Sequence, residues 1–444
     1  MVRDAPANPQ AAGASVRRAG ATAVALLVLA AAGWFLLAPA FAPTAGEETA
    51  DREEAWTTVS VTPFDWIGGD ASQAYLARGI GEALATDLGR LGELRLIGAG
   101  GAAPADAARQ ARYVVSGSVQ RDADTLRVNV RLADTRTGEQ LWSERFERPV
   151  AELFAIQDDI IGRVAASLPA KVSESRKKRL AARHTQSIEA YDLFLRAQAL
   201  FLARGAKENL EARELYRKAI EIDPRFARAY AGLSMTHAIE NRLDGTPLSA
   251  AALDRALALA ESAREIDPAI AEVQWALGFV HTQARRYPQA LGALGRAIEL
   301  NPSFADAHAL MGGIHTYLGE PRKSIPLLRT AMRLEPGAGY LYFLLLGRAY
   351  FFEGDIEQAL INLRAALERN AADLETRIYL AAALAASGNR AAAEWEAEEI
   401  RALARDFSPA RWLATYPLAS APHREKLRGL LEPLYTVPPA TLAR

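Results

Sequence analysis

The pattern of hydrophobic and polar residues changes near residue 175. Before this point, runs such as residues 112–122 and 125–134 alternate with a period of two, which is typical of strands that bury one face. Residues 73–92 have a helical period instead. The predicted order over residues 56–175 is β-α-β-α-β-β-β-α, which indicates one small α+β domain. The predicted buried faces consist of Leu76, Ile80, Leu84 and Leu88 in the helix and Leu126, Val128, Val130 and Leu132 in the second run.

Residues 188–406 lack the strand pattern and repeat a helical unit at a fixed interval. Pro268, Pro302 and Pro336 follow the ends of helical stretches and lie 34 residues apart. Small residues such as Gly278 let two helices approach closely, and large ones such as Leu294 fill the space between neighbours. This period and residue pattern resemble those of tetratricopeptide repeats. They predict an all-α solenoid of about six repeats, with a linker helix before it at residues 176–187 and a C-terminal cap after it at residues 407–444.

The N-terminus has the pattern of a membrane anchor. Residues 19–38 are twenty residues without a charge, which is enough for a helix to cross a bilayer. Arg17 and Arg18 precede this segment, and an acidic linker at residues 39–55 follows it. The positive-inside rule therefore places a tail of residues 1–18 in the cytoplasm and the remainder in the periplasm of a bacterium, with the chain crossing the inner membrane once. A cleaved signal peptide ending near Ala42 is the alternative, and it also exports the remainder.

Composition excludes several kinds of site. The 444 residues carry a net charge of -1, so no basic surface indicates nucleic acid, and the absence of cysteine excludes disulfides and thiolate zinc sites. The motif at residues 98–103, "GAGGAA", matches a dinucleotide-binding loop in spacing only, because the helix after it is short, and a flexible turn is the better interpretation. His237, His281 and His315 recur at a packing position of the repeats, so we expect no metal and no cofactor.

Other residues with reactive side chains lack the surroundings that catalysis needs. Asp158 and Asp159 are adjacent on a helix and point about 100° apart, so they do not converge. Ser234 lacks the setting of a nucleophile elbow. Arg127, Asn129 and Arg131 lie on the outward face of the sheet without a base or nucleophile beside them. The sheet is therefore expected to be a scaffold or a partner-facing surface, and the chain is not expected to be an enzyme.

The exported part also resembles a known pair of domains. Residues 59–98, 113–148 and 152–168 resemble the TolB-N-terminal-like (FlgO-like) domain, which precedes tetratricopeptide repeats in many bacteria. The resemblance implies a relationship to proteins in which this pair follows a class III adenylate cyclase domain, or a CadC-like winged-helix domain and a membrane helix. Because residues 1–18 are too few for either effector, the activity of such relatives is not carried over.

A partner-binding groove is expected on the solenoid. In tetratricopeptide arrays the concave groove is lined by the first helix of each repeat, and aromatic residues there favour an apolar peptide or helix as partner. Packing against the next repeat is an equally open interpretation for each residue. The expected groove residues are Phe201, Met235, Trp275, Phe279, Leu344, Arg348 and Phe351.

Two functions remain open from the sequence. The first is a membrane-anchored, non-catalytic periplasmic scaffold that binds a protein or peptide partner. Self-association of this scaffold is a further possibility. The alternative is the periplasmic sensory arm of an adenylate-cyclase-like or CadC-like signalling system whose effector is a separate chain. The fold expected for both is an α+β domain followed by an all-α tetratricopeptide solenoid, with one N-terminal transmembrane helix.

Overall fold

A computed structural model describes residues 57–91, 94–98, 104–168, 185–203, 205–240 and 249–436. Residues 57–444 form one compact unit. The expected cytoplasmic tail, transmembrane helix and linker lie outside the described residues, as does most of the expected linker helix. Among the helices that the structure describes, none is long and apolar enough to cross a membrane.

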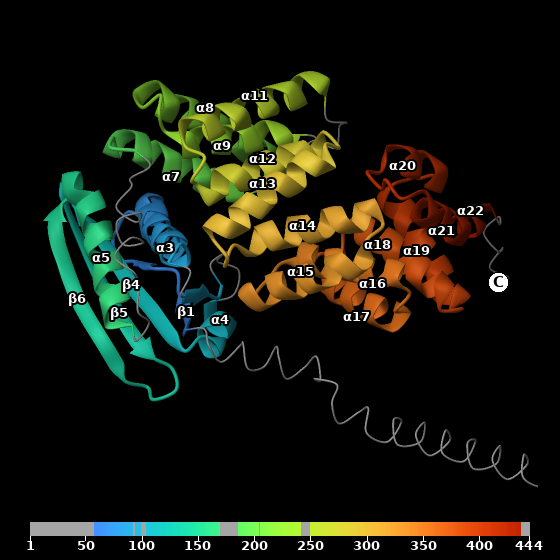
Figure 1. Cartoon of the computed structure of the whole chain (residues 1–444), viewed down its shortest axis with the longest axis horizontal. Coiled ribbons are helices and arrows are strands. Elements are labelled where there is room, and N and C mark those ends of the chain that lie inside the picture. Colours follow the sequence, from blue (N-terminus) through green and yellow to red (C-terminus); the bar gives the residue numbers. More distant parts are fainter. Residues whose placement is uncertain are drawn as a thin grey trace, which may run out of the picture. The chain divides into compact units, whose positions relative to one another are not determined.

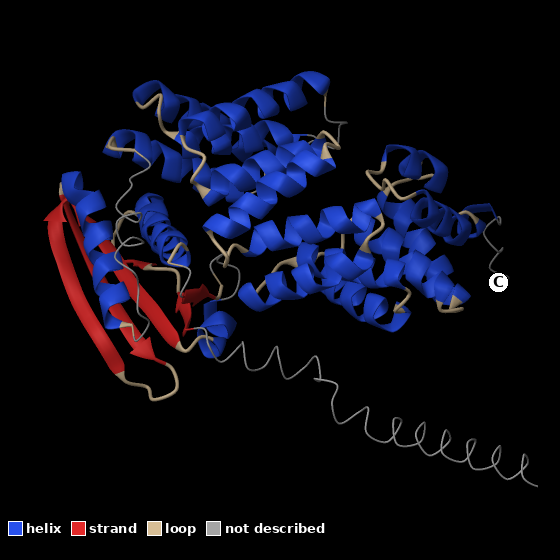
Figure 2. Ribbon diagram, viewed as in Figure 1, coloured by secondary structure: helices blue, strands red, loops and turns tan. Residues whose placement is uncertain are grey.

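The strands belong to one sheet in the N-terminal third of the chain (Figure 2). Its order is β3-β1-β4-β5-β6, with β1 parallel to β3 and β4 and the pairs β4–β5 and β5–β6 antiparallel. A short strand, β2, pairs with β4 and was not predicted. The strands are β1 (Thr57–Val61), β2 (Asp65–Trp66), β3 (Leu94–Leu96), β4 (Tyr113–Asp122), β5 (Thr125–Asp134) and β6 (Gln140–Pro149).

Helices α3 (Ala74–Gly89) and α5 (Leu153–Ser167) pack on one face of the sheet, while α4 (Pro104–Gln110) precedes β4. The side chains predicted to face the core are buried: Leu76, Ile80, Leu84 and Leu88 of α3, and Leu126, Val128, Val130 and Leu132 of β5. The alternate residues of β5, including Arg127 and Arg131, remain at least partly exposed. The period-two pattern therefore correctly predicted which face of β5 is buried.

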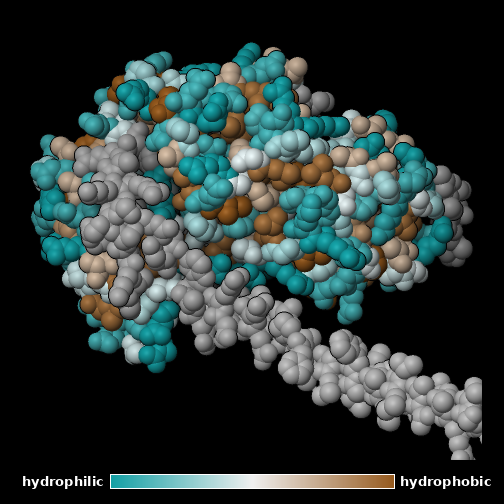
Figure 3. Space-filling view, in the orientation of Figure 1, coloured by the Kyte–Doolittle hydropathy of each residue, from teal (hydrophilic) through white to brown (hydrophobic). Residues whose placement is uncertain are grey.

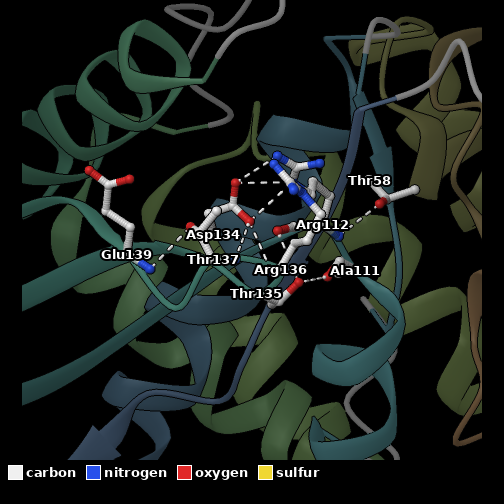
Figure 4. A network of polar contacts seen from close by, with 8 residues as sticks. All are labelled: Thr58, Ala111, Arg112, Asp134, Thr135, Arg136, Thr137 and Glu139. Carbon is white, nitrogen blue, oxygen red and sulfur yellow. Dashed lines mark hydrogen bonds and ion pairs between the residues drawn. The ribbon is translucent and has the colours of Figure 1, made fainter.

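A polar network closes the end of the β4–β5 hairpin (Figure 4). The Arg112 guanidinium donates to both oxygens of Asp134 at 3.0–3.1 Å from Nε and at 2.8 Å from Nη2. Asp134 also accepts from the amides of Arg136 and Thr137, which shapes the turn into β6. These hydrogen bonds, led by those from Arg112, lower the pKa of the Asp134 carboxyl. The Asp134 carboxylate thus accepts hydrogen bonds from Arg112 and from the turn that follows β5, and these bonds hold the end of the hairpin in place.

The rest of the described chain is helical. Among the described residues, six helical hairpins follow one another, and three shorter helices come after them (Figure 1). The hairpins are α7 (Ile188–Leu202) with α8 (Ala206–Ile222), α9 (Ala227–Ala238) with α11 (Ala250–Ile266), α12 (Ala271–Gln283) with α13 (Tyr287–Leu300), α14 (Ala305–Leu318) with α15 (Pro321–Leu334), α16 (Tyr340–Glu353) with α17 (Ile356–Arg369), and α18 (Leu374–Ala386) with α19 (Arg390–Leu403). The last helices are α20 (Pro409–Thr415), α21 (Ala421–Leu431) and α22 (Pro433–Thr436).

One residue pair repeats in the hairpins and explains their close packing. A Cβ added at Gly278 would lie 2.7 Å from Leu294, and one added at Gly312 would lie 2.8 Å from Leu328. Because real Cβ atoms essentially never come this close to another atom, a larger residue at either position would force the leucine side chain to shift. The small–large pattern seen in the sequence therefore corresponds to a direct contact between the two helices of a hairpin.

The hydrophobic core is continuous across the boundary expected near residue 175. One buried cluster extends from Val59 in β1 to Leu233 in α9. Helix α3 packs against α7, where Tyr75 donates to Asp192. The Leu96 amide also donates to Ser303 Oγ at 3.0 Å. The α+β part and the repeats are therefore joined by a shared core and by hydrogen bonds, which the residue pattern of either part alone did not indicate.

Candidate peptide-binding groove

The first helices of the repeats form the inner face of the solenoid. Helix α9 packs against α12, α12 against α14, α14 against α16, and α16 against α18. Each second helix instead packs on its own first helix and on the first helix of the next repeat. Since the first helices are the closer-spaced layer, they lie on the inner side of the curve that the repeats make. This is the face on which the sequence placed a groove.

The C-terminal residues of the chain cover part of this inner face. Lys426 of α21 donates to the Phe351 carbonyl at 2.7 Å, and the His423 ring stacks on Phe352 with ring centroids 4.2 Å apart. Between α20 and α21, residues 416–420 run without helical structure beside the end of α14. There the amide of Ala419 donates to the Tyr317 carbonyl at 2.8 Å. We call residues 408–436 the C-terminal cover.

A buried polar cluster anchors this cover. Arg348 of α16 is 1% exposed and donates from Nη1 to Glu375 at 2.9 Å and to the Tyr416 hydroxyl at 2.8 Å. Tyr416 in turn donates to Glu375. Burial raises the pKa of the Tyr416 hydroxyl well above its usual value, so it remains a donor. The guanidinium also lies over the Tyr317 ring, 4.3 Å from its centroid, as a cation–π contact.

Four of the seven expected groove residues are buried, and the expectation that they line an open groove is wrong. Leu344 and Phe351 are at most 2% exposed because they lie in the hydrophobic cluster that includes Tyr416 and Leu418 of the C-terminal cover. Arg348 is 1% exposed and is hydrogen-bonded to Tyr416. Met235 is 5% exposed for another reason: it packs between α9 and α12 against Val273 and Ala276. The packing interpretation, left open for each residue, holds for these four.

The other three expected residues are half-buried and pack against one buried cluster. Phe201, Trp275 and Phe279 all pack against the cluster that contains Met235. The Trp275 ring lies 5.9 Å from the Phe279 ring and 6.0 Å from the Phe304 ring. Its Nε1 is buried and has no hydrogen-bond partner among the described residues. We call Phe201, Trp275 and Phe279 the aromatic patch; whether it binds a partner stays a prediction.

Hydrophobic side chains also reach the surface nearby. On the face shown in Figure 3, hydrophobic residues gather over the region that α13–α15 occupy in Figure 1. The partly buried residues of α14 include Leu310, Met311 and Leu318. Apolar surface next to the aromatic patch is suited to contact with another apolar surface.

The sequence did not identify the residues that hold the C-terminal cover. Glu375, Tyr379 and Tyr416 come from α18 and from the segment after α20, and only the fold brings them to Arg348. A signal was present in the tail, because Trp412 and Tyr416 are four residues apart and therefore share one face if the segment is helical. Their rings stack with centroids 4.2 Å apart.

The candidates for chemistry have ordinary structural surroundings. Ser234 Oγ donates to the Ala256 carbonyl at 2.7 Å, and Asp159 pairs with Arg148 at 2.7 Å. His237 and His281 are buried, and His315 shares a hydrogen bond with Glu320 at 2.7 Å. Within the ranges that the structure describes, no group of acidic and histidine residues is arranged to hold a metal ion. Most of "GAGGAA" lies outside the described residues.

Comparison with known proteins identifies one of the repeats. Residues 341–373 match the family model described as "Tetratricopeptide repeat". A curated relative, "Putative adenylate cyclase 3" of Rhizobium meliloti (strain 1021), is 32% identical over 261 residues. The match covers 56% of this chain and 44% of the relative, so the chain spans less than half of that protein's length.

Solved structures of repeat proteins are similar to part of the chain. A thermophilic TPR protein of Thermus thermophilus is 23% identical, with a TM-score of 0.36, over 44% of this chain and 98% of its own. YrrB, a TPR protein with an unusual peptide-binding site, is 21% identical, with a TM-score of 0.32, over 43% of this chain and 93% of its own. The resemblance of residues 57–168 to a TolB-N-terminal-like domain stays a prediction.

Proposed function

We propose that the chain is a non-catalytic scaffold that binds a protein or peptide through the inner face of its repeats, one of which, residues 341–373, matches the tetratricopeptide repeat model. The observation that carries this proposal is that the inner face already holds a peptide segment, the chain's own residues 416–420. This segment is bound through a main-chain hydrogen bond to Tyr317 and through the Tyr416 side chain. An external peptide would use the same kinds of contact on the part that remains uncovered.

The aromatic patch is the proposed binding surface. Half-buried aromatic residues supply large, rigid contact areas and are typical sites of binding energy at protein interfaces. The apolar partly exposed residues of α14 extend the surface towards the C-terminal cover.

The binding proposal is tested by site-specific crosslinking in cells. A photoreactive amino acid replaces Phe279 in the full chain, and crosslinked proteins are identified by mass spectrometry. We expect Trp275→Ala to weaken capture at this position by about tenfold or more, since truncating one such residue costs about 2 kcal/mol of binding. Trp395→Ala is the matched control, because Trp395 is 57% exposed on the second helix α19.

The outcome is interpretable only for folded variants. Trp275 packs against Phe304, so Trp275→Ala also lowers stability, and circular dichroism must show that it remains folded at the temperature of the experiment. Equal loss of capture in Trp395→Ala, or undiminished capture in folded Trp275→Ala, would refute the aromatic patch as the binding surface.

We further propose that residues 19–38 anchor the chain in the inner membrane, with the repeats in the periplasm. The support is the length of the uncharged segment and the arginines before it. A reporter that functions only in the periplasm should be active when fused after Arg444, and the protein should stay with membranes after a salt wash. Recovery in the soluble periplasmic fraction would instead show a cleaved signal peptide.

The alternative function is a sensory arm of a signalling system. It is favoured by the similarity to a protein named as a putative adenylate cyclase, although the match covers less than half of that protein. Formation of cyclic AMP from ATP and Mn²⁺ by the purified chain would contradict the non-catalytic proposal. A change in cellular cyclic AMP on deletion of the chain, without activity in the purified chain, would favour the sensory arm.

A further inference from the structure

Strand β6 forms one edge of the sheet (Figure 1). It pairs with β5 over most of its ten residues, and no strand in the described part of the chain pairs with its other side. A long edge strand offers a row of amide and carbonyl groups to which another strand can bind. Natural proteins usually protect such edges, so the residues on β6 decide what it can accept.

The backbone of β6 offers hydrogen bonds at alternate residues. The Val150 amide donates to the Asp124 carbonyl at 2.7 Å, so Val150 faces β5. In an antiparallel ladder, successive residues direct their amide and carbonyl groups to opposite sides. The register between β5 and β6 is regular from Thr125 to Leu132. The amide and carbonyl groups of Arg145 and Glu147 therefore point away from β5, towards the free edge.

The charges on β6 are complementary to a second copy of β6. Residues 144–148 read Glu, Arg, Phe, Glu, Arg, so each residue on one side of Phe146 has the opposite charge of its mirror position. When two copies pair antiparallel with Phe146 opposite Phe146, Arg145 faces Glu147 and Glu144 faces Arg148. By symmetry each pair occurs twice, which makes four opposite-charge pairs and no like-charge pair.

We propose that the chain forms a symmetric dimer in which the two β6 strands pair antiparallel about Phe146 and join the two sheets into one. This register is preferred over its neighbours for an electrostatic reason. In the two neighbouring symmetric registers, the pairing is centred on residue 145 or on residue 147, and side chains on one face of the sheet still lie opposite side chains on the same face. These registers put Arg145 opposite Arg145 or Glu147 opposite Glu147. Like charges directly opposite in a sheet are destabilising, whereas opposite charges stabilise the pairing.

The side chains that would pair are accessible. Arg145 and Glu147 have side chains that are 56% and 45% exposed and lie on the polar face of the sheet. Glu147 accepts hydrogen bonds from Arg127 at 3.0 Å and from Arg145 at 2.9 Å within the same chain. On the other face, Glu144 and Arg148 already lie near Arg163 and Asp159 of α5. These exposed ion pairs are weak, so they rearrange at small cost when a second strand binds.

Charge reversal distinguishes this dimer from any other. The full chain is purified in a mild detergent, and its mass is measured by native mass spectrometry and by analytical ultracentrifugation. We expect the unsubstituted protein to form dimers. Arg145→Glu puts two acidic residues opposite each other, and Glu147→Arg puts two arginines opposite each other, each twice per dimer. Each single variant should therefore raise the dimer dissociation constant by about tenfold or more.

The mixture of the two single variants gives the sharpest result. At positions 145 and 147, one strand then carries two acidic residues and the other carries two basic residues, so the heterodimer should be tighter than either weakened homodimer. The double variant Arg145→Glu with Glu147→Arg should dimerise like the unsubstituted protein. Arg131→Glu is the matched control, because Arg131 is exposed on the same face of the interior strand β5 and should leave dimerisation unchanged.

Several results would overturn the proposal. An unsubstituted protein that stays monomeric at about 100 μM would exclude a specific dimer of useful strength. Dimers that persist in both single variants, or a mixture that fails to form heterodimers, would place self-association elsewhere or assign the β6 edge to the strand of a different protein. Circular dichroism of each variant excludes misfolding as the cause of a lost dimer.

Discussion

Arg348 shows how the chain accommodates a charge in its interior. The guanidinium is 1% exposed; its Nη1 donates to Glu375 and to the Tyr416 hydroxyl and its carbon lies over the Tyr317 ring, while Nε and Nη2 have no hydrogen-bond partner among the described residues. A buried charge is tolerated when it is paired and hydrogen-bonded, and removing one partner is strongly destabilising. These partners come from three different parts of the chain, and one of them, Tyr416, belongs to the C-terminal cover. Arg348, which was expected to contact a ligand, therefore holds the C-terminal cover in place instead.

At the same scale, His237 predicts a pH dependence of stability. Burial, followed by the nearby charge of Arg213, lowers the pKa of His237 to about 4 in the folded protein, against 6.5 for the ordinary side chain. Between these values the unfolded chain binds a proton that the folded protein does not bind. Acidification from pH 6.5 towards pH 4 should therefore remove about 2–3 kcal/mol of the free energy of unfolding through this residue.

The measurement compares the free energy of unfolding of the wild type and of His237→Gln from pH 7.5 to pH 4.5 by chemical denaturation. The comparison is needed because burial raises the pKa of Asp87 to about 6, which acts in the opposite direction. The free energy of unfolding of the wild type minus that of His237→Gln should decrease as the pH falls. A difference that is constant with pH would show that His237 does not titrate as inferred.

At the scale of the element, the hairpins depend on close approach at one glycine. A Cβ at Gly312 would lie 2.8 Å from Leu328 and 3.2 Å from the Ser324 carbonyl oxygen, so Gly312→Ala should lower the free energy of unfolding by about 1–3 kcal/mol through overpacking. Gly292 of α13 is the control, because nothing lies within 4 Å of a Cβ built there. Gly292→Ala should stabilise the helix by about 0.5–1 kcal/mol.

Both variants are measured by urea denaturation. If Gly312→Ala is as stable as the wild type, then Leu328 moves aside at little cost and the small residue is not what fixes the distance between the two helices. The same test applies to Gly347, where the added Cβ would meet Leu363 at 2.7 Å.

At the scale of the whole molecule, the α+β part and the first repeats should lose structure together. The buried cluster from Val59 to Leu233 includes Leu195 of α7, which packs where a Cβ at Gly79 of α3 would lie. Leu195→Ala should cost about 2–5 kcal/mol through the cavity it leaves. We expect hydrogen exchange of the full chain to show reduced protection in β4 and β5 as well as in α7–α9.

Ile400→Ala provides the comparison, because Ile400 belongs to a different buried cluster in the last repeats. It should reduce protection in α18 and α19 and leave β4 and β5 nearly unchanged. If Leu195→Ala affects the helices alone, residues 56–175 unfold separately, as the sequence pattern by itself had indicated.

The sequence by itself determined the local elements, since their signals are short-range. Alternation in residues 125–134 set the buried face of β5, and helical spacing in residues 73–92 did the same for α3. The 34-residue period and the pattern of small and large residues, such as Gly278 and Leu294, determined the hairpins, because a repeat carries the same requirement many times. The short strand β2 was missed because two residues contain no periodicity.

Only the tertiary structure decided which of these surfaces remain available. Leu344 and Phe351 have the pattern of groove residues, but they are covered by residues far along the chain, and no local pattern encodes that contact. The same holds for the packing of α3 on α7, which joins two segments that each have a plausible core of their own. The spacing of residues along the chain predicts which side chains share one face of a helix or strand. Which segment packs against that face depends on contacts between residues far apart in the chain, and a single sequence contains no local pattern for them.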